Sequence, residues 1–520
     1  MGCRVRLRTV AGMLAVAVML IGAFAGQLRA AEEVASLEEL IVLGLKTNLG
    51  LRVEQLQVRG DALSVAIEDA VFDPELYSAA GFSRQTAPYV TTTADGRLTS
   101  RETFAEIGLR KGFTTGLTGS LSLRTERLSG EDLTSALDPG YRNALLLELR
   151  QPLLRQRGTD INTTDLQRFR YRLQQTELGY LLQAQTLALQ LETAVRSLAA
   201  QEQTVALRQQ ALVLADQLLK ANQKRFDEGL VPITEVQEAQ AARAARELRY
   251  AQSLQQQQEL QVQLRRHLNW QLPADFRAQP LIARNSSSSH LTVTAPDVAS
   301  SLVVAREKRL DLQVSRLSIK ISEVQQNYLK NQLQPQLDLR LLAGLNGLAG
   351  RNDNAPDHAY RGGFVDSFDS LGQADGHHLR AAVEFSVPLG NRAARSRLLQ
   401  AQTITRQQQY RLADLDAQLA LEVEEQVINF DHSARQLTIA DEFQRLATIA
   451  LEQEQRRIEA GLSDTFRLLS FQDNMIDARI DRLQAAVRHQ LARARLAYVR
   501  GEVLERYTIA LPVRMEGLTP

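Results

Sequence analysis

The sequence predicts a mainly α-helical fold with a smaller β portion, in which long helices occur in two tandem copies. Three observations predict it. The segment Arg225–Gln240 returns near the end of the chain as Arg457–Gln472. Gln, Leu, Ala and Arg dominate long stretches while aromatic residues make up 5% of the chain, a composition that suits extended helices. Two segments between the helical patterns alternate apolar and polar residues, which is typical of strands.

The repeated segment is a Gly-Leu turn that ends one long helical pattern and starts another. Gly229 and Gly461 are 232 positions apart, and Gln240 and Gln472 are separated by the same distance in sequence. Within the same register, Val236 corresponds to Leu468. A constant offset over a whole segment indicates a tandem duplication.

Residues 1–30 have the features of a secretory signal peptide: basic residues at the start, an apolar run over Val10–Ala25, and Ala30 as the cleavage residue. The alternative is an uncleaved anchor helix. Cys3, the single cysteine, lies in this segment, so a cleaved chain has no disulfide, no cysteine-bound zinc and no thiol chemistry. Basic and acidic residues number 61 and 60, which argues against nucleic-acid binding.

The first repeat is expected over residues 31–268. Its elements, in order, are a helix over Ser36–Phe72 begun by a capping box and stopped by Pro74, strands over about 75–151, a long helix over Thr159–Gly229, a tip turn at 229–232, and a helix over Ile233–Leu268. A Pro- and Ser-rich linker, residues 269–298, follows it.

The second repeat is expected over residues 299–510. Its elements are a helix over Val298–Leu333, strands over about 336–388, a long helix over Asn391–Ala460, a tip turn at 461–463 and a helix from Asp464 to about Glu505, before a tail at 511–520. In each repeat, the two shorter helices together match the length of the long one. We therefore expect them to stack end to end beside it, with both tip turns at one end, both β segments at the other and the linker at mid-height.

The strands alternate apolar residues with charged ones. In Asn143–Arg150, for example, Leu145, Leu147 and Leu149 face opposite to Glu148 and Arg150. Strands of about ten residues with this pattern are typical of an outer-membrane β-barrel wall, and the alternative is a soluble sheet with one buried face. The first β segment is longer by about one hairpin, which predicts four strands there and two in the second segment. Six strands cannot enclose a wide pore, and an open edge cannot face lipid, so the chain must oligomerise.

These features resemble the TolC-type outer-membrane efflux channel family over nearly all of residues 36–510. The resemblance rests on ordered pairs of motifs: Glu228–Leu230 with Glu235–Gln240, Ala460–Leu462 with Leu468–Gln472, Phe72–Leu76 before the strands, Gln151–Leu154 after them, and Pro335 and Pro388. It implies a homotrimer with one shared outer-membrane β-barrel continuous with a periplasmic α-helical barrel of coiled coils. It also implies docking onto a periplasmic membrane-fusion adaptor of an inner-membrane transporter.

By this resemblance, Gly229, Leu230, Gly461 and Leu462 are the adaptor-docking tips, although a plain helix–helix turn also needs a glycine. The periplasmic entrance is expected near Glu235, Arg467 and Ser470. Family members often place acidic residues after the second turn, whereas Arg467 and Ser470 stand there in this chain. Arg467 either repels cations at the entrance or pairs with a neighbouring carboxylate.

We expect a passive exit duct of a tripartite efflux or type I secretion system, embedded in outer-membrane lipid, and no enzyme. No catalytic set stands out, and we expect neither a cofactor nor a metal site; His377 and His378, with His358 nearby, are interpreted as part of a solvated loop. The alternative is a periplasmic coiled-coil scaffold or adaptor that does not span the membrane. The sequence does not separate small-molecule from protein export.

Overall fold

The structure, a computed structural model, describes residues 37–90, 95–130, 137–269, 296–374, 376–460 and 462–507. The predicted signal peptide, the tail at 511–520, Gly461 and most of the predicted linker lie outside these residues. The chain divides into two compact units. Unit 1 comprises Met1–Arg59, Thr176–Val314 and Leu412–Pro520, and unit 2 comprises Gly60–Gln175 and Ser315–Arg411.

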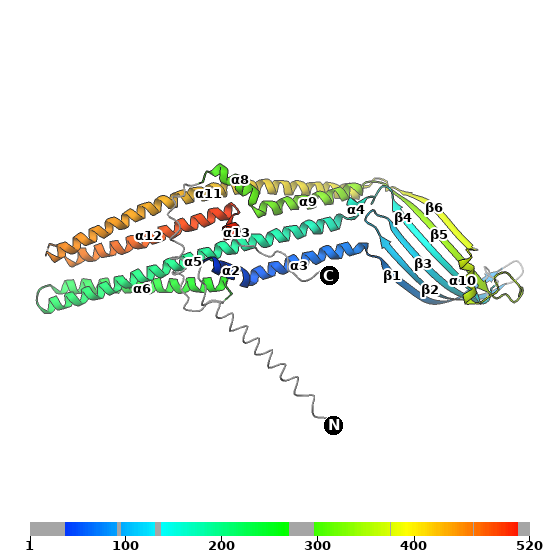
Figure 1. The fold of residues 1–520 in the computed structure, drawn as a ribbon, viewed down its shortest axis with the longest axis horizontal. Helices are drawn as coiled ribbons and strands as arrows, with labels where there is room; N and C mark the ends of the chain where they lie inside the picture. Colours follow the sequence, from blue (N-terminus) through cyan, green and yellow to red (C-terminus); the bar gives the residue numbers. More distant parts are fainter. Residues whose placement is uncertain are drawn as a thin grey trace, which may run out of the picture. The chain divides into compact units, whose positions relative to one another are not determined.

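Helices make up most of the described chain, which confirms the mainly α fold class (Figure 1). They are α2 (Leu37–Thr47), α3 (Leu49–Asp69), the short 3-10 helix η1 (Ala70–Phe72), α4 (Thr159–Asn162), α5 (Thr164–Asp227), α6 (Ile233–His267), α8 (Val298–Lys308), α9 (Leu310–Asn331), α10 (Phe364–Gly372), α11 (Arg392–Glu459), α12 (Thr465–Val499) and α13 (Val503–Arg506). None of these described helices is long and apolar enough to cross a membrane.

Four helices that we expected to be continuous are broken, between α2 and α3, α4 and α5, α8 and α9, and α12 and α13, and polar side chains explain the first and the third break. Asn48 separates α2 from α3: its Oδ1 accepts a hydrogen bond from the amide of Leu51 at 3.1 Å, as a helix N-cap does, and its Nδ2 donates to the carbonyl of His267 at 3.0 Å. Arg309 has an extended backbone between α8 and α9. Its guanidinium binds Asp311 at 2.6 Å and Glu422 at 3.2 Å.

Unit 2 contains one antiparallel sheet in the order β1-β2-β3-β4-β5-β6. The strands are β1 (Glu75–Val90), β2 (Asp95–Gly112), β3 (Thr118–Gly130), β4 (Gly140–Pro152), β5 (Gln336–Gly350) and β6 (Gly376–Ser386). Four strands therefore come from the first β segment and two from the second, as predicted. They are longer than the expected ten residues because polar, Thr- and Ser-containing stretches continue the pairing beyond the apolar part. The β4–β5 pairing joins the two repeats, and β1 and β6 are the open edges.

Helix α10 was not predicted, because its segment has the Gly- and Asp-rich composition of a loop. Phe364, Phe368 and Leu371 recur at helical spacing, and the carboxylate of Asp366 accepts a hydrogen bond from the amide of Gly363 at 2.6 Å. The helix packs on β4 and β5. The expectation of a loop at 377–378 was also wrong, because His377 and His378 lie in β6, paired with Leu345 and Gly344.

Two apolar clusters of described residues contribute to the core of unit 1. One joins Ala211 of α5 to residues of the α11–α12 hairpin, namely Leu451, Leu468, Met475, Ile476 and Ile480. The other joins α8 and the start of α9 to α11 and α12 around Val423 and Phe430. Val236 and Leu468, which correspond in the sequence repeat, are both buried. Equivalent positions of the two copies therefore both supply core residues.

His489 on α12 makes the stability of unit 1 depend on pH. Its ring lies 5.0 Å from that of Phe430 and its Nδ1 is 3.0 Å from Oγ of Ser433. Burial, and secondarily the charge of Arg493, lower the pKa of His489 below its usual 6.5. The unfolded chain therefore takes up this proton first as the pH falls, so stability should decrease below about pH 6.5. The apparent melting temperature should show this step in the wild type and a smaller one in His489→Gln.

Candidate functional site

The first candidate site is the turn between α5 and α6. Gly229 has φ +75°, a left-handed conformation that favours glycine. Its amide donates to the carbonyl of Phe226 at 2.8 Å, and the amide of Leu230 donates to the carbonyl of Arg225 at 2.8 Å. No atom lies within 4 Å of where a Cβ would stand. The conformation of the turn, and not a lack of space, therefore requires glycine here.

The turn between α11 and α12 repeats the second of these hydrogen bonds. The amide of Leu462 donates to the carbonyl of Arg457 at 2.9 Å, which matches the bond from Leu230 to Arg225 in the first turn. Gly461, the predicted counterpart of Gly229, lies outside the described residues. Asp464 then caps α12 by accepting a hydrogen bond from the amide of Arg467 at 2.8 Å. The hydrogen bond that closes the first Gly-Leu turn therefore recurs in the second copy of the sequence repeat.

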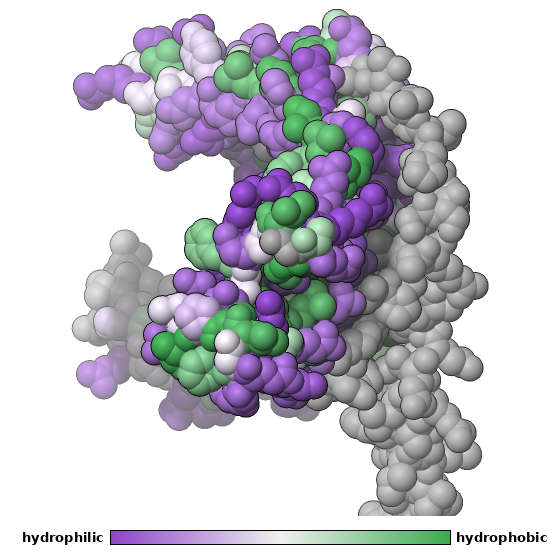
Figure 2. Space-filling view, turned by 90° about the vertical axis from the view of Figure 1, so that its left-hand side faces the viewer, coloured by the Kyte–Doolittle hydropathy of each residue, from purple (hydrophilic) through white to green (hydrophobic). Residues whose placement is uncertain are grey.

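Both turns present apolar side chains to solvent. Leu230 is 66% exposed and Leu462 is 70% exposed. Phe226 and Ile233 near the first turn and Phe466 near the second are also exposed, and the sequence reading missed them. Figure 2, which looks onto the turn end of unit 1, shows hydrophobic residues in green among predominantly hydrophilic ones in purple. We call these five residues, Phe226, Leu230, Ile233, Leu462 and Phe466, the tip residues. The aromatic residues close to the Gly-Leu turns were the signal in the sequence that could have identified them.

The predicted entrance residue Glu235 connects the two repeats. Its Oε2 accepts a hydrogen bond from Oγ1 of Thr465 at 3.0 Å. The buried side chain of Asn222 on α5 reaches the same hydroxyl, with Nδ2 3.4 Å from Oγ1 of Thr465. Asn222 and Glu235 belong to the first repeat and Thr465 to the second. The start of α12 is therefore tied to the first hairpin by side-chain hydrogen bonds.

Arg467, the second predicted entrance residue, pairs with a carboxylate. Its Nε lies 3.5 Å from Oε1 of Glu454, whose side chain is 3% exposed and also accepts a hydrogen bond from the hydroxyl of Ser463. Of the two expectations for Arg467, this geometry favours the neighbouring carboxylate over an unpaired cation. Ser470, the third predicted residue, is exposed on α12.

A buried arginine that the sequence reading missed forms the strongest tie between the repeats. Arg246 on α6 is 3% exposed, and its guanidinium lies 3.0 Å from Oδ1 of Asp473 on α12. It also donates to Oε1 of Gln472 and to the backbone carbonyl of Ala211 on α5, both at 3.3 Å. The sequence does contain a signal for this contact. Val236, Ala239 and Arg246 lie on one helical stripe, so Arg246 is a charged residue at a position of the buried face.

Outer charge pairs surround this tie. Arg243 on α6 reaches Asp216 on α5 at 2.5 Å, and that hydrogen bond raises the pKa of Arg243 above its usual value. Arg208 on α5 reaches Asp477 on α12 at 3.0 Å. Partly exposed pairs of this kind contribute little to stability. The buried Arg246 is therefore the contact whose loss should matter most.

The second candidate site is the sheet of unit 2, whose two faces differ in chemistry. The exposed large apolar side chains of its described strand residues all lie on one face: Leu76, Phe82, Ile107, Leu109, Leu121, Leu147, Leu341, Leu379, Val383 and Phe385. Leu379 is 80% exposed. We call this the apolar face. A soluble sheet would bury such a face, so its exposure indicates a nonaqueous environment.

The opposite side, the charged face, is crossed by ion pairs between neighbouring strands. Arg110 pairs with Glu75 at 2.7 Å, Arg150 with Asp338 at 2.8 Å, and Arg340 with Glu384 at 3.0 Å. Arg124 on β3 lies within reach of three glutamates, Glu102, Glu106 and Glu126. Opposite charges across strands stabilise the pairing, and this face suits water.

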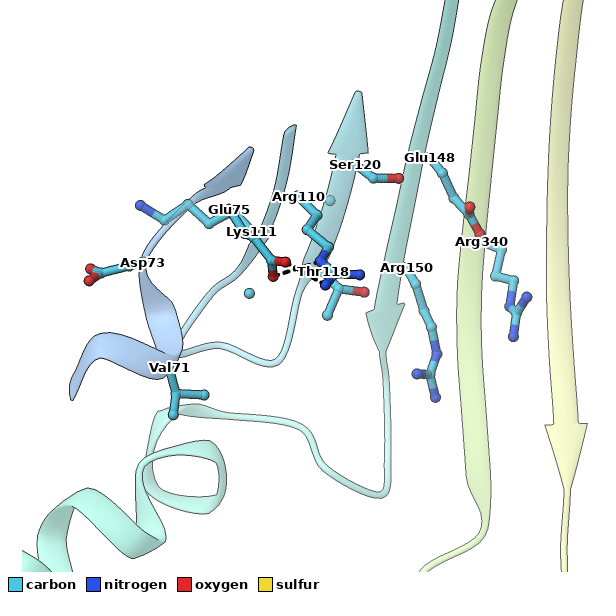
Figure 3. A pocket seen from close by; sticks show the side chains of 12 residues that line it. Val71, Asp73, Glu75, Arg110, Lys111, Thr118, Ser120, Glu148, Arg150 and Arg340 are labelled. Carbon is cyan, nitrogen blue, oxygen red and sulfur yellow. Dashed lines mark hydrogen bonds and ion pairs between the residues drawn. The ribbon is translucent and has the colours of Figure 1, made fainter. Parts of the chain in front are cut away.

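A hollow of about 410 Å³ lies on the charged face where β1 begins and β2 and β4 end. Figure 3 shows Arg110 on β2 beside Glu75, Arg150 and Arg340 on the adjacent strands β4 and β5 near Glu148, and Asp73 at the side. Both basic and acidic groups line it. The hollow is therefore a polar surface of the sheet and not an enclosed binding cavity.

Comparison with known proteins gives similarities in structure only. No family model matches the sequence, and no curated protein matches it. The structure is similar to that of VceC from Vibrio cholerae, an outer membrane protein, with 16% identity, a TM-score of 0.59 and coverage of 89% of this chain and 96% of that one. For the MtrE outer membrane channel of Neisseria gonorrhoeae the values are 14%, 0.62, 92% and 91%.

A third similar structure is the CmeC outer membrane channel of Campylobacter jejuni, with 13% identity, a TM-score of 0.60, and coverage of 90% of this chain and 85% of that one. Low identity over nearly the whole chain shows a shared fold. The chain therefore has the fold of the TolC-type outer-membrane channels, as its sequence motifs predicted.

Proposed function

We propose that the protein is an outer-membrane channel that serves as a passive exit duct and performs no catalysis. The single observation that carries the proposal is the sheet: one exposed apolar face, one charged face with ion pairs, and two open edges at β1 and β6. Backbone groups on an open edge cannot remain unpaired in lipid. The edges must therefore pair with other copies of the chain.

We propose a homotrimer. Three copies of a six-stranded sheet supply a number of strands comparable to the 16 to 18 strands of porins, whose barrels leave an aqueous channel. The charged faces would line the water-filled interior and the apolar faces would contact the outer-membrane lipid. The helices of unit 1 would form coiled coils of an α-helical barrel in the periplasm, delivered there by the signal peptide at residues 1–30.

The partners we propose are a periplasmic membrane-fusion adaptor and an inner-membrane transporter, which supplies the energy. The adaptor would dock on the two turns at Gly229, Leu230, Gly461 and Leu462. The exposed tip residues support this. A glycine turn lets another backbone approach closely, and the apolar side chains beside it can serve as anchors for the partner. The duct suits either small-molecule efflux or type I protein secretion, since the transporter selects the cargo.

We further propose that the entrance is held closed near Glu235, Arg467 and Ser470. The hydrogen bonds from Thr465 to Glu235 and from Arg246 to Gln472 fasten α12 to the first hairpin. Opening would be an iris-like movement of the α11–α12 hairpin that exchanges these contacts for solvent. The pairing of Arg467 with Glu454 places its charge within its own hairpin during this movement.

The docking proposal predicts the behaviour of a double variant. Leu230→Asp/Leu462→Asp should fold and reach the outer membrane but reduce pump-dependent export by about tenfold or more, because two central apolar anchors are lost. Export of a fluorescent substrate from intact cells measures this. Leu248→Asp/Leu421→Asp, which changes exposed leucines away from the turns, is the matched control. Equal export by both double variants would exclude the turns as the docking surface.

A further inference from the structure

The apolar face of the sheet carries basic residues and, among the strand residues whose side chains the structure describes, no acidic ones. Three of them form a cluster. Arg84 on β1 lies directly opposite Arg101 on β2, and Arg127 on β3 lies opposite Thr103, diagonal to Arg101. Arg84, Arg101 and Arg127 are called the arginine cluster below. All three side chains are exposed.

This cluster is unlike three arginines of the charged face. There Arg110, Arg150 and Arg340 each pair with a carboxylate on the next strand. Within the described chain, the cluster shows no such partner, and two of its members face each other across β1 and β2. Like charges directly opposite are destabilising in a sheet. An anion from outside the chain would remove that repulsion.

The cluster lies where the apolar part of the face ends. On β5 the apolar residues run from Leu337 to Leu345, about 27 Å along the strand. Beyond that level, Arg127 pairs with Tyr141 of β4, whose ring centroid is 6.0 Å from that of Phe364 on α10. Aromatic residues gather at the edges of the apolar band of membrane barrels, and arginine is tolerated on the lipid face at those edges but not at its middle.

We propose that the arginine cluster binds the phosphate groups of an anionic glycolipid in the outer leaflet of the membrane, with Tyr141 and Phe364 against the same headgroup. Guanidinium groups bind phosphate through paired hydrogen bonds. A lipid fits better than a soluble anion, because the cluster shares its face with exposed leucines that acyl chains would cover. The inference rests on the proposed outer-membrane location, and it assigns the end of the sheet bearing α10 to the outside.

The test compares lipid binding by two double variants of the full-length chain purified in detergent. Arg101→Gln/Arg127→Gln removes two members of the cluster, and Arg142→Gln/Arg380→Gln removes two arginines of the charged face. Native mass spectrometry counts bound bisphosphorylated lipid A. The cluster variant should bind it about tenfold more weakly than the wild type, since each basic residue near an anionic membrane surface adds several-fold in affinity. The charged-face variant should bind it normally.

Three further measurements test which group the cluster binds and whether its charge is what matters. Lipid A without phosphates should bind weakly to the wild type, and inorganic phosphate at equal concentration should not displace the intact lipid. Arg101→Lys/Arg127→Lys, which keeps both charges, should retain more lipid than the glutamine variant. Equal binding by the cluster and charged-face variants, equal binding of the dephosphorylated lipid, or displacement by inorganic phosphate would each overturn the proposal.

Cell fractionation separates this inference from the proposed function. Wild-type chain absent from the outer membrane would contradict both. Wild-type chain that is present there as a trimer, together with undiminished lipid binding by Arg101→Gln/Arg127→Gln, would contradict the lipid site alone.

Discussion

Replacing Asp473 with alanine should lower the free energy of unfolding by about 3 kcal/mol, near the low end for breaking a buried ion pair. The change leaves the guanidinium of Arg246 buried at 3% exposure without its carboxylate. The carbonyl of Ala211 and the side chain of Gln472 still accept hydrogen bonds from it, which limits the loss. Because the pair joins α6 to α12, the variant should also spend more time open in single-channel conductance recordings.

The matched control for this variant is Asp441→Ala. Asp441 pairs with Arg482 at 2.7 Å, but both side chains are about half exposed, so its loss should cost at most about 1 kcal/mol. A second variant, Arg246→Met/Asp473→Ala, should recover part of the stability because no unpaired charge remains buried. Denaturant unfolding followed by circular dichroism measures all three. If Asp473→Ala and Asp441→Ala were equally mild, the buried tie would not hold the two repeats together.

Replacing Leu147 with arginine should prevent assembly of the channel. Leu147 lies in the middle of the apolar face, between Leu121 on β3 and Ala343 on β5. An arginine facing lipid at the midplane costs about 2–4 kcal/mol in a membrane barrel, and every copy in an oligomer would bear this cost. We expect little folded protein in the outer membrane, measured by fractionation and by migration of the oligomer in unheated gels.

The adjacent residue provides the control. Leu146 points to the charged face, opposite Ser122 on β3 and Gly344 on β5. Leu146→Arg introduces the same charge one position away and should assemble nearly as well as the wild type, because that face suits water. Equal assembly of Leu147→Arg and Leu146→Arg would mean that neither face of the sheet meets lipid.

Much of the fold could be predicted because its signals are local and repeated. Gly229 needs its left-handed conformation whatever surrounds it, and the same backbone hydrogen bond recurs at Leu230 and Leu462. Strict alternation of apolar and charged residues identifies strands and their faces, since successive side chains of a strand point to opposite sides. The difference in length between the two β segments was enough to predict four strands in one and two in the other.

The breaks in the helices could not be predicted, because their causes lie far away in the sequence. Asn48 caps α3 while it also donates to His267, and Arg309 leaves the helix to reach Glu422. Neither partner is visible in a local pattern. Helix α10 has the composition of a loop, and it packs closely on β5 because Gly347 has no side chain: an added Cβ would stand 2.1 Å from the carbonyl oxygen of Ser367.

The candidate site was also predicted only in part, again because local patterns are visible in the sequence and long-range contacts are not. The sequence pointed to Leu230 and Leu462, which the structure leaves exposed at the turns. It offered two expectations for Arg467, and only the structure brings Glu454 to its guanidinium. Arg246 looked like one of many surface arginines on a Gln-rich helix. Its importance depends on burial against α5 and α12, and helix packing of this kind is decided by tertiary structure.

The central claim is that three copies close into one barrel through β1 and β6, and cysteine cross-linking between these edges tests it most directly. Cys3 is the only natural cysteine, so pairs such as Ser78→Cys with Ala381→Cys, scanned along both strands, report contacts between copies. In intact outer membranes, at least one pair should yield covalent dimers and trimers and no larger species. Chains that stay monomeric across the whole scan, or a ladder that continues beyond the trimer, would contradict the account.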